Sequence, residues 1–184
     1  MPDSSAVPNG SVQALKVADH SPSRVLVLFH LGDQLAAFPM EDVERIAPMA
    51  ELARPAGLPS VVEGILNWSG RAVPVLRLDR LLPLPSVSFG LYSMLIVLRG
   101  VSDGRVAVPV DRVSEIVTVL ARNLLQVSAE NSFNGCSQAT VLVKERPVPI
   151  LSPARILVQR ERETLSEFGR VAQMRLQNWE AGNS

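Results

Sequence analysis

Hydrophobic positions along most of this chain fall in short, strand-length runs. Residues 25–31 form a nearly continuous apolar run that ends at a Gly-Asp pair, and residues 35–38 resume the extended pattern. Residues 94–98 and 106–108 form a second such pair around Asp103-Gly104. Apolar runs on either side of a turn containing Gly and Asp are typical of β-hairpins, because these residues tolerate the positive φ of a tight turn. The pattern therefore predicts two hairpins.

Two further hairpins are expected on the same grounds. Residues 64–76 place extended runs on each side of Ser69-Gly70, and residues 139–151 do so around a turn at 144–146. Four prolines lie inside the strand-like runs, at positions 39, 74, 109 and 149. Because proline cannot donate to a β-ladder, we expect short, bent strands that turn the corners of a barrel. The alternative is that each proline simply ends a strand.

The chain contains a degraded copy of itself. Residues 38–46 align with 108–116 at an offset of 70, and residues 71–76 align with 146–151 at an offset of 75. A period near 70 residues is too long for a solenoid unit and suits a small β-barrel. Two similar modules joined by one chain meet at a seam, and we expect the function to lie there.

The ends of the chain differ from the repeats. Residues 1–22 are rich in Ser and Pro, which predicts a flexible leader. Residues 153–180 change to a helical period, which predicts a C-terminal helical extension. Its stripe comprises Leu157, Glu161, Leu165, Phe168, Ala172, Leu176 and Trp179. This helix either packs back onto a barrel edge or meets a partner helix.

Composition narrows the classes of partner. Lys+Arg and Asp+Glu both number 18, so the net charge is zero and no basic surface is available for nucleic acid. No apolar stretch reaches the roughly 20 residues that span a bilayer, so we expect no direct membrane insertion. The chain also lacks a secretory signal pattern, and its lone Cys136 suits a reducing compartment, so we expect a soluble cytoplasmic protein.

The sequence offers no catalytic constellation. His20, His30 and Cys136 are too few and too far apart for a Cys/His metal site. No nucleophile elbow, P-loop or dinucleotide-binding glycine pattern is present. We therefore expect a protein that is not an enzyme and that uses no cofactor or metal.

Four segments resemble the CheW-like family of chemotaxis coupling proteins, and the resemblance covers roughly residues 23–158. The most specific is the pattern G-x-x-N-x-x-G-x-x-V-P-V-x-x-L at 64–78; the others are 28–34, 43–46 and 110–116. The resemblance implies two intertwined five-stranded SH3-like barrels around a shared apolar core. One subdomain would lie at about 34–90 and the other at about 91–150, with strand exchange between them.

The resemblance also implies a non-catalytic adaptor in chemotaxis or chemotaxis-like signal transduction. Its partners would be the helical hairpin tip of a chemoreceptor and the regulatory domain of a CheA-type histidine kinase. Such a protein is expected to be monomeric in isolation and to be recruited to receptor arrays. The main alternative is a small-ligand-binding β-barrel module without a kinase partner.

Two positions depart from the family pattern. The family usually carries Arg two places after the motif Asn67, where this chain has Ser69, and often carries Glu where this chain has Arg45. A bidentate guanidinium contact is therefore missing, unless Arg71 replaces it. The two changes are either a compensated charge exchange or the mark of a divergent partner.

The expected partner-binding residues lie at the seam and at one hairpin turn. A receptor helix docks by laying an apolar stripe into a groove, which makes Val43, Ile46, Val113 and Ile116 candidates for its lining. The alternative for each is a place in the core.

Charged and aromatic candidates complete this set. Arg45 and Glu115 occupy equivalent repeat positions with opposite charges and are expected to orient a partner. Trp68 beside the turn is either an interface anchor or a packed barrel residue. Asn67, Ser69 and Arg71 of the same turn complete the expected sites.

Overall fold

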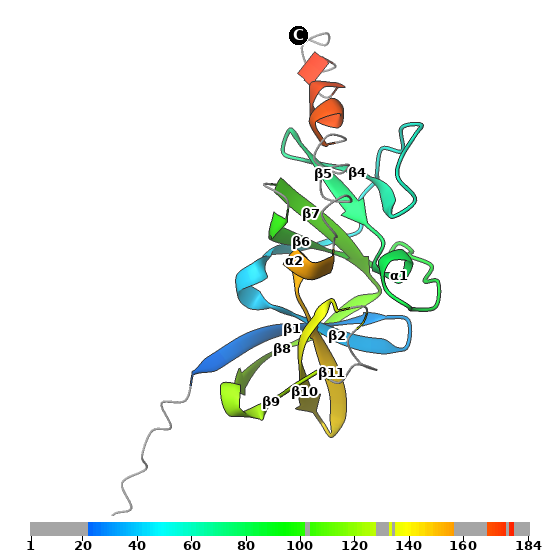
Figure 1. Ribbon diagram of the computed structural model, residues 1–184. Helices are drawn as coiled ribbons and strands as arrows, with labels where there is room; N and C mark the ends of the chain where they lie inside the picture. Colours follow the sequence, from blue (N-terminus) through cyan, green and yellow to red (C-terminus); the bar gives the residue numbers. More distant parts are fainter. Residues whose placement is uncertain are drawn as a thin grey trace, which may run out of the picture.

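The computed structural model describes residues 22–101, 104–127, 133, 135–156, 169–175 and 177–178. Their strands form two antiparallel-rich sheets (Figure 1). The first has the order β8 (Arg112–Leu120), β1 (Ser23–Leu31), β2 (Gln34–Pro39), β11 (Arg146–Leu151), β10 (Ser137–Val143) and β9 (Leu124–Leu125). The second has the order β3 (Val43–Pro48), β6 (Met94–Val101), β7 (Gly104–Val110), β5 (Arg71–Leu76) and β4 (Val62–Trp68).

Short helical segments connect these strands. They are η1 (Met40–Asp42), α1 (Leu78–Leu81), η2 (Ala121–Asn123) and α2 (Pro153–Ile156). Residues 169–175 and 177–178 are also helical. The predicted mainly β fold is confirmed, and the two-residue β9 makes the first sheet six-stranded.

The two repeats exchange their opening hairpins. Hairpin β1–β2 of the first repeat lies in the sheet that holds β8, β10 and β11 of the second repeat. Hairpin β6–β7 of the second repeat lies with β3, β4 and β5 of the first. The parallel contacts that join the hairpins, Ala37 with Ile150 and Val75 with Ala107, fall at equivalent repeat positions. Neither sheet is therefore a continuous stretch of sequence.

The ladder irregularities follow the predicted offsets. Bulges fall at Glu44 in β3 and Ser114 in β8, 70 residues apart. Two more fall at Glu63 in β4 and Gln138 in β10, 75 residues apart. Three of the four prolines lie inside strands, and Pro39 is the last residue of β2. A bulge adds a local bend to a strand, so both copies curve at the same place.

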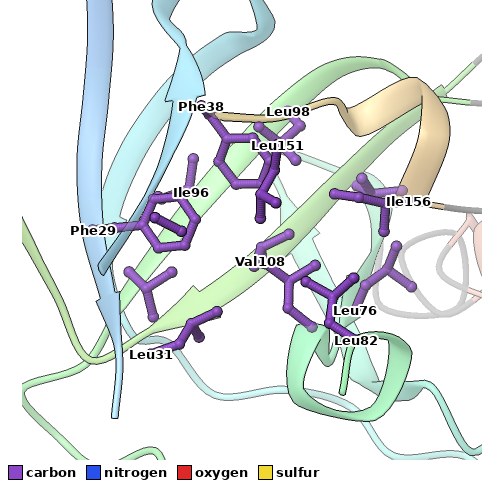
Figure 2. Packing of buried hydrophobic residues seen from close by; sticks show 14 of the residues in the cluster. Phe29, Leu31, Phe38, Leu76, Leu82, Ile96, Leu98, Val108, Leu151 and Ile156 are labelled. Atoms are coloured by element: carbon purple, nitrogen blue, oxygen red, sulfur yellow. The ribbon is translucent and has the colours of Figure 1, made fainter. Parts of the chain in front are cut away.

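Three apolar clusters fill the fold. The largest lies between the two sheets and includes Phe29 and Phe38, whose rings stack with centroids 4.9 Å apart (Figure 2). Each sheet also encloses a smaller cluster of its own. Strand β1 serves two of the clusters, because Val27 and Phe29 face the inter-sheet core while Leu26 and Leu28 face the first sheet's interior. Burial of both faces explains the continuous apolar run in the sequence.

A buried ion network holds the loop between α1 and β6. The Arg77 guanidinium donates to Asp79 Oδ1 at 2.7 Å and to Glu63 Oε2 at 3.0 Å, and it lies 4.7 Å from the Phe89 ring centroid. The Asp79 carboxylate also accepts a hydrogen bond from the Val87 N–H at 2.9 Å. The network therefore ties the end of β5 to the loop that covers one side of the inter-sheet core.

The same network makes the free energy of unfolding depend on pH in the acid range. Burial acts to raise the pKa of Asp79, but hydrogen bonds from Arg77 and from the Val87 N–H outweigh it and hold the pKa below the ordinary 3.8. Burial is likewise outweighed at Glu63, where hydrogen bonds from Arg54 and Arg77 hold the pKa below 4.5. A carboxylate whose pKa is lower in the folded state contributes stability above its unfolded-state pKa. That contribution is lost as the pH falls through the folded-state value.

We therefore expect the free energy of unfolding to fall as the pH is lowered from about 5 to below the unfolded-state pKa values of the two carboxyls. Urea unfolding at a series of pH values measures this. Asp42 acts in the opposite direction, because burial raises its pKa. A double variant, Glu63→Gln with Asp79→Asn, isolates the network and should show a shallower pH dependence. An unchanged slope in that variant would show that other groups cause the acid sensitivity.

The C-terminal helical residues pack on the second sheet. Ala172 is buried, and the Gln173 side chain bonds to the backbone of Gly70 and Ala72. Figure 1 shows this segment beside the β4–β5 hairpin. Of the two alternatives for this helix, the contacts support packing back onto a barrel, at β5 and its turn rather than along an edge strand. The other members of the predicted stripe, and residues 1–21 of the predicted leader, lie outside the described residues.

Candidate functional site

The first candidate surface is the end of the β4–β5 hairpin. Ser69 and Gly70 have φ of 50° and 76°, so both central residues of the turn are left-handed, as a type I′ hairpin requires. The Asn67 side-chain oxygen accepts a hydrogen bond from the Gly70 N–H at 3.0 Å. Asn67 thus holds the turn, and the exposed side chains of Ser69 and Arg71 flank it.

Arg45 and Trp68 meet at this hairpin. The Arg45 guanidinium carbon lies 5.6 Å from the Trp68 ring centroid, within the range of a cation–π interaction. Arg45 is on β3 and Trp68 on β4, the two edge strands of the five-stranded sheet. Their contact shows that the sheet curls until its edges approach, as in a barrel. Trp68 also packs against the cluster inside this sheet, so it is half-buried and only part of its ring remains for a partner.

The second repeat carries an equivalent surface of different charge. Glu115, the counterpart of Arg45, accepts a hydrogen bond from Lys144 Nζ at 3.0 Å. Lys144 and Glu145 form the left-handed turn of the β10–β11 hairpin, with φ of 49° and 64°. In both repeats, therefore, the residue at position 45 or 115 contacts the following hairpin. The side chains that this contact presents differ between the two copies.

The interior of the seam is a filled core. Val43 is only 2% exposed and belongs to the inter-sheet cluster, and Val113 and Ile46 pack against that cluster. A partner helix has no access to Val43 in this arrangement, so we do not include it in the surface proposed below. For Val43 the structure supports the core alternative.

Ile116 is different, because it lies where the inter-sheet core reaches solvent. It is 55% exposed and pairs with the fully buried Val27 of β1, so the two side chains share one face of the sheet. Val25 and Met40, both exposed, lie next to the last residue pair of β1 and β2, Leu26 with Pro39. Val25 is two residues from Val27, and Met40 follows the last residue of β2. We call Val25, Met40 and Ile116 the apolar rim.

The repeat equivalents of the apolar rim are less exposed. Ile46, the counterpart of Ile116, is half-buried, and Val110, the counterpart of Met40, is fully buried. Partly buried residues of α1 and of the connecting loops also pack against the inter-sheet cluster: Leu58, Val61, Leu81, Leu84, Val87 and Phe89. The internal symmetry is therefore broken, because Ile116 is 55% exposed and its counterpart Ile46 is half-buried.

Sequence reasoning missed two parts of these surfaces. Val25 and Met40 belong to no sequence motif. They are apolar residues near the end of a strand that the fold leaves exposed, and the sequence does not show that exposure. Gln173 lay on the polar face of the predicted C-terminal helix, and its amide meets the hairpin only through folding. Arg77 and Asp79 hold the loop between α1 and β6. In the sequence they are visible as charged residues next to an apolar motif, but that pattern does not by itself predict a buried ion network.

A groove of about 580 Å³ lies between the connector after β3 and the C-terminal helix. Its lining includes Leu52, Pro55 and Ile65 from the barrel side and Ala172 and Arg175 from the helix. Within the described residues, no group of three or more His, Cys, Asp or Glu is placed to hold a metal ion. No helix in the described part of the chain has the length and apolar character needed to cross a membrane.

Three comparisons place this fold among known proteins. The model of the CheW-like domain family matches residues 25–161. Chemotaxis protein CheW of Thermotoga maritima is 25% identical over 130 residues, which are 70% of this chain and 84% of that protein. The crystal structure of the scaffolding protein TtCheW from Thermoanaerobacter tengcongensis is similar in fold, with a TM-score of 0.69 at 17% identity, over 77% of this chain and 94% of that chain. The family model spans most of the sequence and both sheets, and the chain therefore belongs to the CheW-like domain family.

Proposed function

We propose that this protein is a non-catalytic adaptor that couples the cytoplasmic tip of a chemoreceptor to the regulatory domain of a CheA-type histidine kinase. Membership of the CheW-like family supports an adaptor or scaffold role in chemotaxis. The apolar rim supports a docking surface for a helix, because it is continuous with the core and contains Ile116 at 55% exposure. Exposed apolar residues that gather in one place are typical of interaction sites.

The receptor tip is assigned to the apolar rim. An amphipathic helix binds by placing residues of one face against an apolar strip, and Val25, Met40 and Ile116 present such a strip across β1, η1 and β8. The ion pair between Arg24 and Glu41 borders it, with 3.9 Å between Nη2 and Oε1. A charged border suits the polar flanks of an amphipathic helix.

The kinase regulatory domain is assigned to the β4–β5 hairpin end. Arg45, Trp68 and the exposed Arg71 place two cations and part of an aromatic ring on one small surface. Trp and Arg are the residue types most enriched among interface residues that contribute strongly to binding. Arg45 and Ser69 differ from the usual family residues, so this surface is expected to select a partner with a matching change of charge.

Replacing Arg45 by glutamate tests this assignment. We expect Kd for the kinase regulatory domain to rise by about tenfold or more, because the substitution reverses the surface charge beside Trp68. Thermal stability should fall little, because an exposed cation–π contact contributes about 0.5–1 kcal/mol. Isothermal titration calorimetry with the isolated regulatory domain measures the affinity.

A matched control is Arg99→Glu, which makes the same change at an exposed residue of β6. Binding of the receptor tip to both variants should equal that of the parent. If Arg45→Glu binds the kinase domain as tightly as the parent, Arg45 does not belong to the interface.

A further inference from the structure

In the described part of the C-terminal helix, the side-chain amide of Gln173 bonds to the second sheet. Gln173 Oε1 accepts a hydrogen bond from the Ala72 N–H at 2.8 Å, and its Nε2 donates to the Gly70 carbonyl, also at 2.8 Å. The neighbouring Ala172 is buried. Both polar atoms of the amide are therefore used to hold the helix against the first residues of β5.

These two bonds involve the same pair of backbone groups that a parallel β-ladder would use. In such a ladder, one residue of the added strand bonds the carbonyl of residue i−1 and the N–H of residue i+1 on its neighbour. Gly70 and Ala72 stand in this relation to Arg71. The Gln173 amide thus bonds the two backbone groups that one residue of a parallel strand would bond.

The fold leaves room for such a strand. Strand β7 runs parallel to β5, but the register pair that joins them is Val75 with Ala107, further along both strands. A cavity of about 550 Å³ lies between the first residues of the two strands. Its lining comes from β5 and its turn, from Gly104 and Arg105, and from Gln173 and Gln177 of the helix.

The second repeat lacks the same backbone donor. The counterpart of Ala72 at the offset of 75 is Pro147, which has no N–H. Strand β11 pairs with β2 only further along, at Ile150, and Pro147 has no donor for a further strand at this position. The first repeat keeps its donor and covers it with the Gln173 amide instead.

We propose that the backbone of β5 at Gly70–Ala72 is a further interaction surface, which accepts an extended segment of the kinase regulatory domain as a short parallel strand. In the free protein the Gln173 amide occupies these backbone groups and competes with the kinase segment for them. Docking of the C-terminal helix therefore lowers the affinity of the adaptor for the kinase. The inference rests on the proposed function. The backbone surface at Gly70–Ala72 is continuous with the hairpin end that carries Trp68 and Arg71.

The test compares Gln173→Leu with the parent full-length chain. Loss of both hydrogen bonds should accelerate amide hydrogen exchange at Ala72 in the free protein. Binding of the kinase regulatory domain should then tighten by roughly tenfold, the scale expected when two hydrogen bonds no longer compete. In the complex, Ala72 should be protected again. Gln34→Leu, the same change at an exposed residue of β2 in the other sheet, should leave both measurements as in the parent.

A second variant distinguishes release of the Gln173 amide from access to the β5 backbone at Gly70–Ala72. Ala72→Pro places the second repeat's residue in the first repeat and removes the N–H that Gln173 and the added strand would share. It should release the helix without any gain in kinase affinity. If Ala72→Pro tightens binding as Gln173→Leu does, release of the helix alone is responsible and the strand surface is wrong.

The remaining outcomes distinguish this inference from the function on which it rests. If Gln173→Leu exposes Ala72 to exchange yet binds the kinase domain as the parent does, the inference fails and the adaptor function stands. Unchanged exchange at Ala72 also overturns it, because the amide contact then contributes no protection. If neither protein binds the kinase domain at micromolar concentrations, the proposed function fails and the inference fails with it.

Discussion

Replacing Ile116 by glutamate is expected to weaken binding of the receptor tip by about 30-fold or more, the effect of removing a central interface anchor. Ile116 is the most exposed member of the apolar rim. A carboxylate at this position would have to lose its hydrating water against the apolar face of the receptor helix. The three residues of the apolar rim carry no charge that could compensate it. Sedimentation of the protein with receptor signalling fragments, or calorimetry with a soluble fragment, measures the loss.

Leu142 supplies the matched control for this substitution. It lies on β10 of the same sheet and is 56% exposed, almost the same as Ile116, but it is not part of the apolar rim. Leu142→Glu should therefore bind the receptor as the parent does. Both variants should keep the parent's circular dichroism spectrum, because surface substitutions usually change stability by little. Equal receptor binding by Ile116→Glu and the parent would remove the rim from the receptor site.

The largest effect on stability is expected from Asp79→Ala. The Asp79 side chain is fully buried and forms the bidentate partner of Arg77. Its removal leaves the Arg77 guanidinium in the interior with Glu63 as its carboxylate partner. Breaking one side of a buried ion pair costs about 3–5 kcal/mol. For a chain of this size, that corresponds to a fall in Tm of roughly 6–20 °C.

Arg54→Ala is the control for the ion network. Arg54 also pairs with Glu63, at 3.0 Å, but its side chain is 59% exposed. An exposed ion pair contributes about 1 kcal/mol or less, so Tm should change by only a few degrees. Differential scanning calorimetry on both variants measures the contrast. A similar, small change for Asp79→Ala would mean that relaxation or water compensates Arg77 and that the loop at Val87 does not depend on the network.

Much of this fold is predictable from local pattern. The hairpin turns follow from Ser69-Gly70 and its neighbours, because residues that tolerate positive φ stand between extended runs. The repeat offsets of 70 and 75 reappear as bulges and parallel contacts at equivalent positions. The nearly continuous apolar run at 25–31 also indicated a strand, and the structure buries both of its faces. These features depend on residues close in sequence or on comparison of the chain with itself.

The candidate surfaces are less predictable. Val43, Ile46, Val113 and Ile116 have the same apolar character in sequence, yet the fold buries the first and exposes the last. Arg45 and Glu115 were recognised as equivalent positions of opposite charge, but their actual partners, Trp68 and Lys144, come from separate hairpins. Periodicity identifies which residues share a face of a strand. It does not identify what lies against that face.

The sequence alone therefore determined the hairpins, the duplication, the family and the class of function to propose, because turn chemistry, apolar period and motif spacing are local properties of the chain. Tertiary structure decided which copy of a repeated surface remains open. Ile46 packs against the inter-sheet cluster, while Ile116 remains exposed at the equivalent place. The Gln173 amide covers a backbone donor that the second repeat replaces with Pro147. Exposure depends on contacts between segments far apart in sequence, and equal local patterns acquire different roles when those contacts differ.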